Sequence, residues 1–196
     1  MHRYGWRAAV KRLFVGILLS LVSGCPVHAA AIPAKYDFQF RKWSSVYMPM
    51  VDYRLLKAQC WQESRFVVNA VSPVGAMGLC QFMPGTWKDT KQALGYPSYA
   101  SAFAPDLSIQ AAAFYMGKMR SIWKAPRPET DRHSFALASY NGGAGNMIKA
   151  QKLANNSPLW PPVAAELHRV TGHNSKETIT YVERIWGFYR SLVISG

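Results

Sequence analysis

Acidic residues are scarce in this sequence. Its 196 residues include ten Asp and Glu against 23 Lys and Arg, which gives a formal net charge of +13. Only 17% of the residues are charged and 49% are hydrophobic, a composition that excludes a disordered chain. The length leaves room for one domain of ordinary size. The excess positive charge indicates an anionic partner, such as nucleic acid, a membrane surface or a cell-wall polymer, without selecting among them.

Several catalytic and metal-binding motifs are also missing. The sequence has no G-x-S-x-G nucleophile elbow and no H-E-x-x-H zinc motif, and residues 142–145 lack the lysine of a phosphate-binding loop. His168 and His173 have no further ligand at metal spacing, so we expect neither a metal nor a cofactor. Cys60 and Cys80 could pair in an oxidising compartment, but the sequence does not show whether they are close.

A hydrophobic run long enough to span a membrane is absent too. The apolar run at residues 13–22 is shorter than the ~20 residues that a span needs, and it follows a basic stretch at residues 3–12. This pattern predicts that residues 1–29 are a signal peptide or a membrane-targeting segment, with the folded part exported to the periplasm or cell envelope. Cleavage after about Ala29, lipidation at Cys25 and a signal anchor that is later released all remain open.

Helical periodicity runs through nearly all of the remaining chain. Apolar residues recur three and four apart in five segments, at residues 51–63, 106–123, 133–140, 144–153 and 176–193. Breaks rich in Gly, Pro, Ser or Asn fall at residues 73–78, 95–105, 125–131 and 155–162. Asp106 is placed to cap a helix, and Pro84 to begin one. A hairpin around residues 75–82 is the one expected β element, so the sequence predicts a mostly α domain over residues 36–195.

One acid, Glu63, stands in a setting that favours chemistry. It shares a helix face with Cys60 and Leu56 and lies near the helix C-terminus, where the helix dipole is negative. Desolvation and the dipole both disfavour the anion. We therefore predict a raised pKa for Glu63, which suits a general acid at neutral pH.

A segment rich in glycine follows nine residues after Phe66, at residues 75–86. Gly75 and Gly78 permit the backbone to approach a ligand closely. Gln81 offers both a donor and an acceptor, which suits a neutral substrate rich in hydroxyl and amide groups.

Five segments together resemble the signature of the soluble lytic transglycosylases. The family pattern runs ES-x-F, GA-x-GL-x-Q-x-MP-x-T, D-x-x-x-N/Q, A-x-YN-x-G and ET-x-x-YV. The matching segments stand in the same order at residues 63–66, 75–86, 106–110, 137–143 and 177–182. The resemblance implies a mostly α, lysozyme-like fold with a short β-hairpin near the active-site cleft. It also implies a lyase that cleaves the β-1,4 bond between N-acetylmuramic acid and N-acetylglucosamine in peptidoglycan.

The same resemblance implies roles for the site residues. Glu63 would be the single catalytic acid and base. The residues that bind the saccharide would be Ser64, Gln81, Tyr140, Asn141 and Tyr181. The supporting residues would be Glu177, Met83, Gly75 and Gly78. Glu177 lies four residues before Tyr181 on the same helix face, a spacing consistent with a supporting hydrogen bond.

The count of acids favours a reaction in which the substrate supplies the nucleophile. Ordinary glycosidases need two flanking carboxylates, whereas Glu63 is the one acid within a dense cluster of site-like residues. In the family's manner, the 2-N-acetyl group would stabilise the oxocarbenium-like centre. The muramoyl O6 would then attack C1 and leave a 1,6-anhydromuramoyl end.

Two other functions stay open at the level of the sequence. A muramidase of goose-lysozyme type would complete the reaction with water, and a non-catalytic wall-binding component of a secretion or conjugation apparatus would not cleave at all.

The expected partner is the peptidoglycan glycan strand, bound by a monomer, with membrane association only through the N-terminal segment or Cys25. Nucleic acid is disfavoured by the export signal. The sequence does not show which role the cleavage would serve: wall opening for secretion, wall turnover or phage-type lysis.

Overall fold

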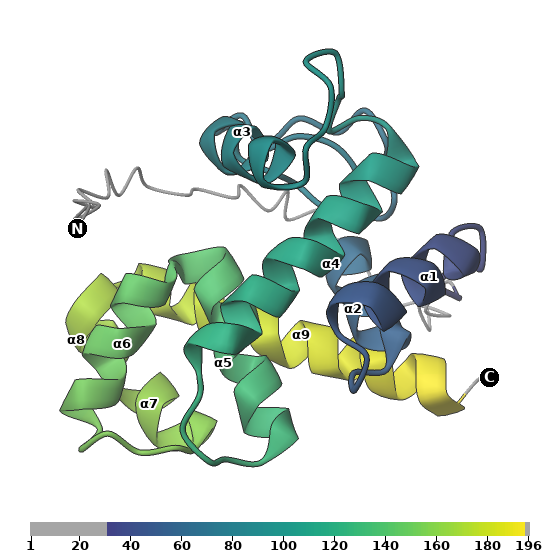
Figure 1. Ribbon diagram of the computed structural model, residues 1–196. Coiled ribbons are helices and arrows are strands. Elements are labelled where there is room, and N and C mark those ends of the chain that lie inside the picture. The colour runs from purple at the N-terminus through teal and green to yellow at the C-terminus, as the bar shows by residue number, and fades with distance from the viewer. Residues whose placement is uncertain (1–30, 195–196) are drawn as a thin grey trace, which may run out of the picture.

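The structure, a computed structural model, describes residues 31–194. The predicted export segment at residues 1–29, the candidate lipidation site Cys25 and the last residue of the predicted domain, Ser195, lie outside the described residues. Within residues 31–194 the chain is mostly helical, as predicted (Figure 1). The helices are α1 (Asp37–Tyr47), α2 (Tyr53–Ser64), α3 (Pro84–Ala93), α4 (Pro105–Ile122), α5 (Glu129–Gly142), α6 (Ala144–Leu153), α7 (Trp160–Glu166), α8 (His168–Thr171) and α9 (Asn174–Ile194). None of these helices has the length and hydrophobicity of a membrane span.

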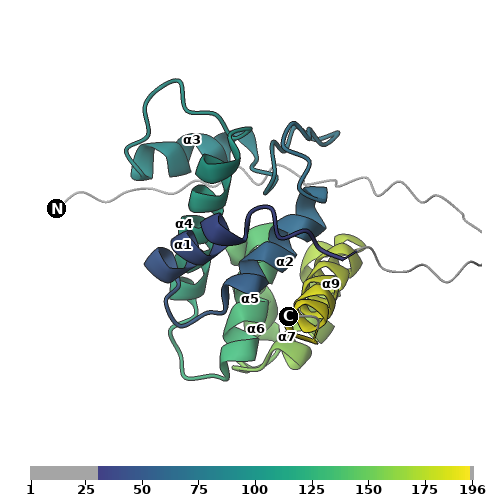
Figure 2. The same cartoon turned by 90° about the vertical axis from the view of Figure 1, so that its right-hand side faces the viewer.

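The long helices α4, α5 and α9 form the centre of the molecule. Helix α9 packs against α2 and α5, and α4 packs against α1 and α5. Helix α3 and the loops around it lie at one end of the molecule, and α6, α7 and α8 lie toward the other, as Figures 1 and 2 show. Segments from the two halves of the sequence therefore meet where α2 lies on α9.

Small residues allow the central helices to approach one another closely. Residues 111–113 of α4 and Ala136 and Ala138 of α5 are alanines that are fully buried. At Gly117 of α4, a Cβ atom would lie 2.7 Å from the backbone oxygen of Tyr47 at the end of α1. The backbones of α1 and α4 thus meet without an intervening side chain.

All five segments with helical periodicity form helices, and the differences from prediction have local causes. Helix α5 begins at Glu129, inside the predicted break at residues 125–131, because Pro128 occupies its N-cap and acidic residues fill its first turn. Helix α7 begins inside the predicted break at residues 155–162. Its prolines lie in the first turn, where a missing N–H costs no intrahelical hydrogen bond.

The prediction that Asp106 caps a helix is wrong. Ala104 is the N-cap of α4, Pro105 is its first residue, and no side chain caps it. The carboxylate of Asp106 instead accepts a hydrogen bond from Trp43 Nε1 over 3.0 Å and joins α4 to α1. The expected hairpin is reduced to two isolated antiparallel bridges, Val71 with Met77 and Met77 with Phe82, and residues 31–194 contain no longer strand.

Cys60 and Cys80, whose pairing the sequence left open, form a disulfide with a Cα–Cα distance of 4.6 Å. Both residues are fully buried. Cys60 lies one turn before Glu63 on α2, and Cys80 directly precedes Gln81. The bond therefore fixes the glycine-rich loop, residues 75–83, to the helix that carries the acid.

We predict that reducing this disulfide lowers the free energy of unfolding by about 3 kcal/mol, because the bond closes a loop across a sequence separation of 20 residues. Urea unfolding of the oxidised and reduced protein measures the difference. The C60A/C80A variant should unfold at the same urea concentration with and without reductant. An oxidised and a reduced wild type with equal midpoints would contradict the prediction.

Candidate active site

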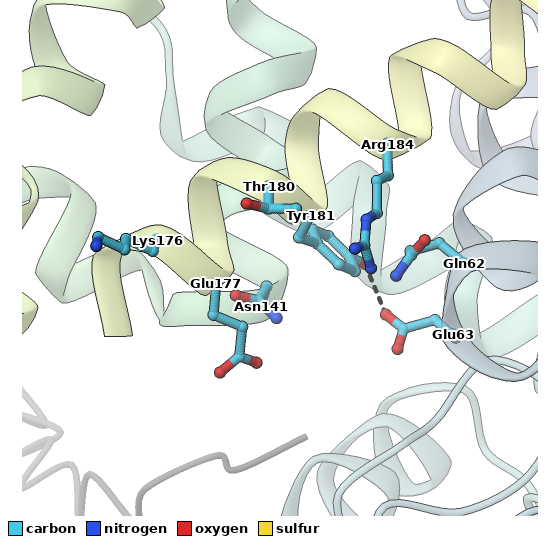
Figure 3. A pocket seen from close by; sticks show the side chains of 8 residues that line it. All are labelled: Gln62, Glu63, Asn141, Lys176, Glu177, Thr180, Tyr181 and Arg184. Atoms are coloured by element: carbon cyan, nitrogen blue, oxygen red, sulfur yellow. Dashed lines mark hydrogen bonds between the residues drawn. The ribbon is translucent and has the colours of Figure 1, made fainter. Parts of the chain in front are cut away.

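Glu63 lies in the last turn of α2, one residue before the helix ends. Arg65 caps the helix in the left-handed conformation with φ 54°, which turns the chain away from the helix axis. Figure 3 shows the carboxyl group of Glu63 directed toward Tyr181 of α9. The Tyr181 hydroxyl donates a hydrogen bond to Glu63 Oε1 over 2.6 Å, and this contact fixes the orientation of the carboxyl group.

The pKa of Glu63 is raised to about 8, as the sequence predicted in direction. The main cause is desolvation of the carboxyl group, to which the negative charge of Glu177 adds. The hydrogen bond from Tyr181 opposes both effects because it favours the charged form. Burial raises the pKa of Tyr181 and of Tyr140 well above 10, so both hydroxyls remain protonated donors at neutral pH.

Two hydroxyl groups anchor the glycine-rich loop to the helices. Ser64 Oγ donates to the carbonyl oxygen of Leu79 over 2.7 Å, and Tyr140 Oη donates to the carbonyl oxygen of Cys80 over 2.9 Å. Together with the disulfide, these bonds hold the loop at a set distance from α2 and α5. Ser64 and Tyr140 therefore position the backbone of the glycine-rich loop, and both also lie near Glu63.

The two glycines of the loop are required for different structural reasons. Gly78 has φ +74°, and a Cβ atom there would lie 2.1 Å from the backbone oxygen of Ala102. Its close approach is therefore to the chain's own backbone, whereas the sequence suggested a ligand. Gly75 has φ +84° and open space around its Cβ position, so only its backbone conformation requires glycine.

Gln81 adopts a left-handed conformation with φ 51°, and its Nε2 donates to the carbonyl oxygen of Gly78 over 2.9 Å. The donor half of this amide is thus used within the loop, although the sequence suggested that both halves would face a substrate. Met83 is the N-cap residue of α3. Both Gln81 and Met83 line a cavity next to Glu63.

Asn141, near the end of α5, connects this helix to α9. Its Oδ1 accepts a hydrogen bond from Thr178 Oγ1 over 2.8 Å, and its side chain also bonds Glu177. Glu177 therefore supports Asn141, while Tyr181 bonds Glu63. Desolvation raises the pKa of Glu177, and the contact with Asn141 partly opposes that rise.

Glu63 and Asn141 lie where two cavities meet. The larger cavity, about 360 Å³, opens between α2 and α9 (Figure 3). It is lined by Gln62, Glu63, Asn141, Lys176, Glu177, Thr180, Tyr181 and Arg184. The smaller one, about 40 Å³, is lined by Glu63, Ala76, Gln81, Phe82, Met83, Thr86, Tyr115, Tyr140 and Asn141. A chain-like ligand that occupied both cavities would pass directly over the carboxyl group of Glu63.

Sequence reasoning missed the residues that α9 contributes besides Glu177 and Tyr181. Thr180 and Arg184 line the larger cavity, and Thr178 holds Asn141. The helical spacing of positions 177, 180, 181 and 184 was the signal that could have found the cavity-lining ones, since they share one face. Within residues 31–194, no group of three or more His, Cys, Asp or Glu side chains is placed to hold a metal ion.

A mostly helical domain with a desolvated carboxyl group in a cleft is the arrangement that the resemblance to a lysozyme-like protein leads one to expect. Residues 40–161 match the family model described as the transglycosylase SLT domain. The chain belongs to this family.

Curated relatives are similar in amino-acid sequence over most of the length of this chain. The membrane-bound lytic murein transglycosylase F of Shewanella halifaxensis is 32% identical over 174 residues, which cover 81% of this chain and 34% of that protein. The Pseudomonas putida protein of the same name is 35% identical over 127 residues, 65% of this chain and 24% of its own length. The chain spans about a third or less of the length of these relatives.

Solved structures share the fold. The lytic transglycosylase Slt of Pseudomonas aeruginosa, in the form of an inactive mutant, matches 81% of this chain and 24% of its own, with a TM-score of 0.62 and 26% identity. The 70 kDa soluble lytic transglycosylase of Escherichia coli matches 83% of this chain and 25% of its own, with a TM-score of 0.63 and 24% identity. The lysozyme-like fold expected from the sequence is confirmed.

We predict that Glu63→Gln stabilises the protein at pH 8 and leaves its stability unchanged at pH 4. The pKa of Glu63 is about 8 in the folded protein, against an ordinary value of 4.5 for a glutamate exposed to water, so the wild type loses stability as the pH rises between these values. Glutamine keeps an acceptor for Tyr181 and removes the charge. We expect a gain on the order of 4 kcal/mol at pH 8.

Urea unfolding at pH 4, 6 and 8 measures this dependence. Glu183→Gln, at an exposed position of α9, is the matched control for the loss of one carboxylate. A stability difference between Glu63→Gln and wild type that stays constant from pH 4 to pH 8 would show that Glu63 titrates as an ordinary carboxyl group.

Proposed function

We propose that this protein is an exported peptidoglycan lytic transglycosylase that cleaves the β-1,4 bond between N-acetylmuramic acid and N-acetylglucosamine. The observation that carries the proposal is the state of Glu63: a desolvated carboxyl group with a pKa of about 8, held by Tyr181 where two cavities meet. Such a group is protonated at neutral pH and can give its proton to a glycosidic oxygen.

In the first step, Glu63 protonates the glycosidic oxygen as the bond from this oxygen to C1 breaks. The N-acetylglucosamine leaves with a new hydroxyl group, and the 2-N-acetyl group of the muramoyl residue stabilises the positive centre at C1. The carboxylate that remains on Glu63 keeps the hydrogen bond from Tyr181, which favours the charged form.

In the second step, the carboxylate of Glu63 takes the proton from the muramoyl O6. The oxygen then forms a bond to C1 and closes the 1,6-anhydro ring, so no water is consumed and Glu63 returns to its protonated form. Asn141 lines both cavities and is held by Thr178, which supports a role for its side chain in orienting an N-acetyl group.

Glu177 supports a second candidate function, a muramidase that completes the reaction with water. It brings a second carboxyl group into the larger cavity, which the count of acids in the sequence did not anticipate. Two carboxyl groups suit ordinary hydrolysis. However, the carboxyl group of Glu177 is engaged by the side chain of Asn141, which leaves it less available to activate water. We therefore favour the transglycosylase.

The disulfide supports export to the periplasm or cell envelope. Disulfides persist in oxidising compartments and are rare in the cytoplasm, and this one is buried beside the site. The membrane-bound relatives are consistent with an envelope location.

We predict that the wild type releases muropeptides with 1,6-anhydromuramoyl ends from purified peptidoglycan, and that Glu63→Gln lowers the rate by at least about 100-fold, the usual loss when a general acid is removed. Digestion in water enriched in heavy oxygen, followed by mass spectrometry, measures both. The anhydro products should carry no heavy oxygen, and Glu183→Gln should act like the wild type.

Reducing ends that carry heavy oxygen would replace the proposal with the muramidase. A Glu63→Gln variant that clears peptidoglycan at the wild-type rate, or a wild type that never cleaves it, would instead favour the non-catalytic wall-binding component.

A further inference from the structure

Gln59 is a polar residue in a part of the core where most side chains are apolar. It lies on α2 four residues before Glu63, so the two side chains share one face of the helix. Its side chain is fully buried, and neither Nε2 nor Oε1 has a hydrogen-bond partner of ordinary geometry. Burying an unpaired amide costs free energy, so its presence here needs a reason other than packing.

The hydroxyl group of Tyr181 is the neighbour on which this amide acts. Desolvation is the main cause that raises the pKa of Tyr181, and the side chain of Gln59 opposes the rise. Within an amide only the nitrogen is a donor, and only a donor favours the charged form of a phenol. The Nε2 atom of Gln59 therefore faces the Tyr181 oxygen, in a contact that is longer or less aligned than an ordinary hydrogen bond.

This contact favours one of the two directions in which Tyr181 can bond a carboxyl group. A phenol hydroxyl both donates and accepts, and a protonated carboxyl group does the same. The Tyr181 hydroxyl donates to Glu63 Oε1 over 2.6 Å. An N–H group beside the phenol oxygen takes up acceptor capacity there and polarises the O–H bond toward Glu63. The proton of neutral Glu63 then lies on Oε2, the oxygen that Tyr181 does not bond.

We propose that Gln59 is a positioning residue for the acid: its amide directs the Tyr181 hydroxyl toward Glu63 Oε1, so that Oε2 holds the proton that is transferred. This inference rests on the proposed function. Oε2 would give its proton to the glycosidic oxygen in the first step and take the proton of the muramoyl O6 in the second. Gln59 does not line either of the two cavities at Glu63, so it acts on the reaction through Tyr181.

Other charged or titratable groups surround Glu63 and Tyr181. Those that line the two cavities with Glu63 are Tyr115 of α4, Tyr140 of α5 and Lys176, Glu177 and Arg184 of α9. A substitution at position 59 leaves all of them in place. A change in the pKa of Glu63 that follows such a substitution therefore reports on the amide.

The test compares Gln59→Met, which keeps the length of the side chain and removes its donor, with Gln92→Met at an exposed position of α3. NMR titration of the Glu63 carboxyl resonance should show a higher pKa in Gln59→Met, because Tyr181 then donates a weaker hydrogen bond to the carboxylate. The rise should be smaller than in Tyr181→Phe. Within the Tyr181→Phe background, Gln59→Met should cause no further change, and Gln92→Met should match the wild type.

Activity and stability separate this role from a purely structural one. On glycan strands, Gln59→Met should lower kcat about fivefold and leave KM unchanged, the effect of losing one hydrogen bond of ordinary strength. In urea the same variant should be at least as stable as the wild type, because an apolar side chain replaces an unpaired amide. A purely structural role predicts a loss of stability and no change in the pKa of Glu63.

Two results would overturn the inference: a Glu63 pKa that does not move in Gln59→Met, or one that moves equally with and without Tyr181. Should Gln59→Met fail to fold, the wild type provides the same test. The Nε2 resonance of Gln59 should shift with the titration of Glu63 in the wild type and no longer do so in Tyr181→Phe, and a resonance that ignores this titration would also overturn the inference. Because these titrations need no cleavage, absence of cleavage by the wild type would overturn only the proposed function.

Discussion

The hydrogen bond from Tyr181 to Glu63 is the contact on which the site depends, since it joins residues 118 positions apart across the interface of α2 and α9. Helix α9 supplies one wall of the larger cavity and α2 supplies the acid, so the cleft exists only where these helices pack. The disulfide then ties the glycine-rich loop to α2. Three chain segments are thereby fixed around one carboxyl group.

The few acids of this sequence have two different roles in the structure. Most acids in the described part of the chain serve ion pairs or helix contacts, whereas Glu63 and Glu177 are desolvated in the cleft, where the neutral form is favoured. The cleft thus holds the two acids whose charged forms the fold disfavours.

Local patterns predicted the helices and the catalytic candidate, but not the contacts between distant segments. Helical periodicity located five helices, while α1, α7 and α8 were not predicted as helices at all. The raised pKa of Glu63 followed from its helix face, yet its main partner, Tyr181, came only through the family resemblance. The pairing of Cys60 and Cys80 and the need for glycine at position 78 depend on tertiary proximity, and no spacing along the chain encodes that.

The central claim is that the folded protein keeps Glu63 protonated at neutral pH, and titration of its side-chain carboxyl resonance by NMR tests this most directly. The account predicts a pKa of about 8 for Glu63. It also predicts a higher pKa in Tyr181→Phe, which loses the donor, and a lower one in Glu177→Gln, which loses the neighbouring charge. A pKa near the ordinary value of 4.5 in the wild type would contradict the account.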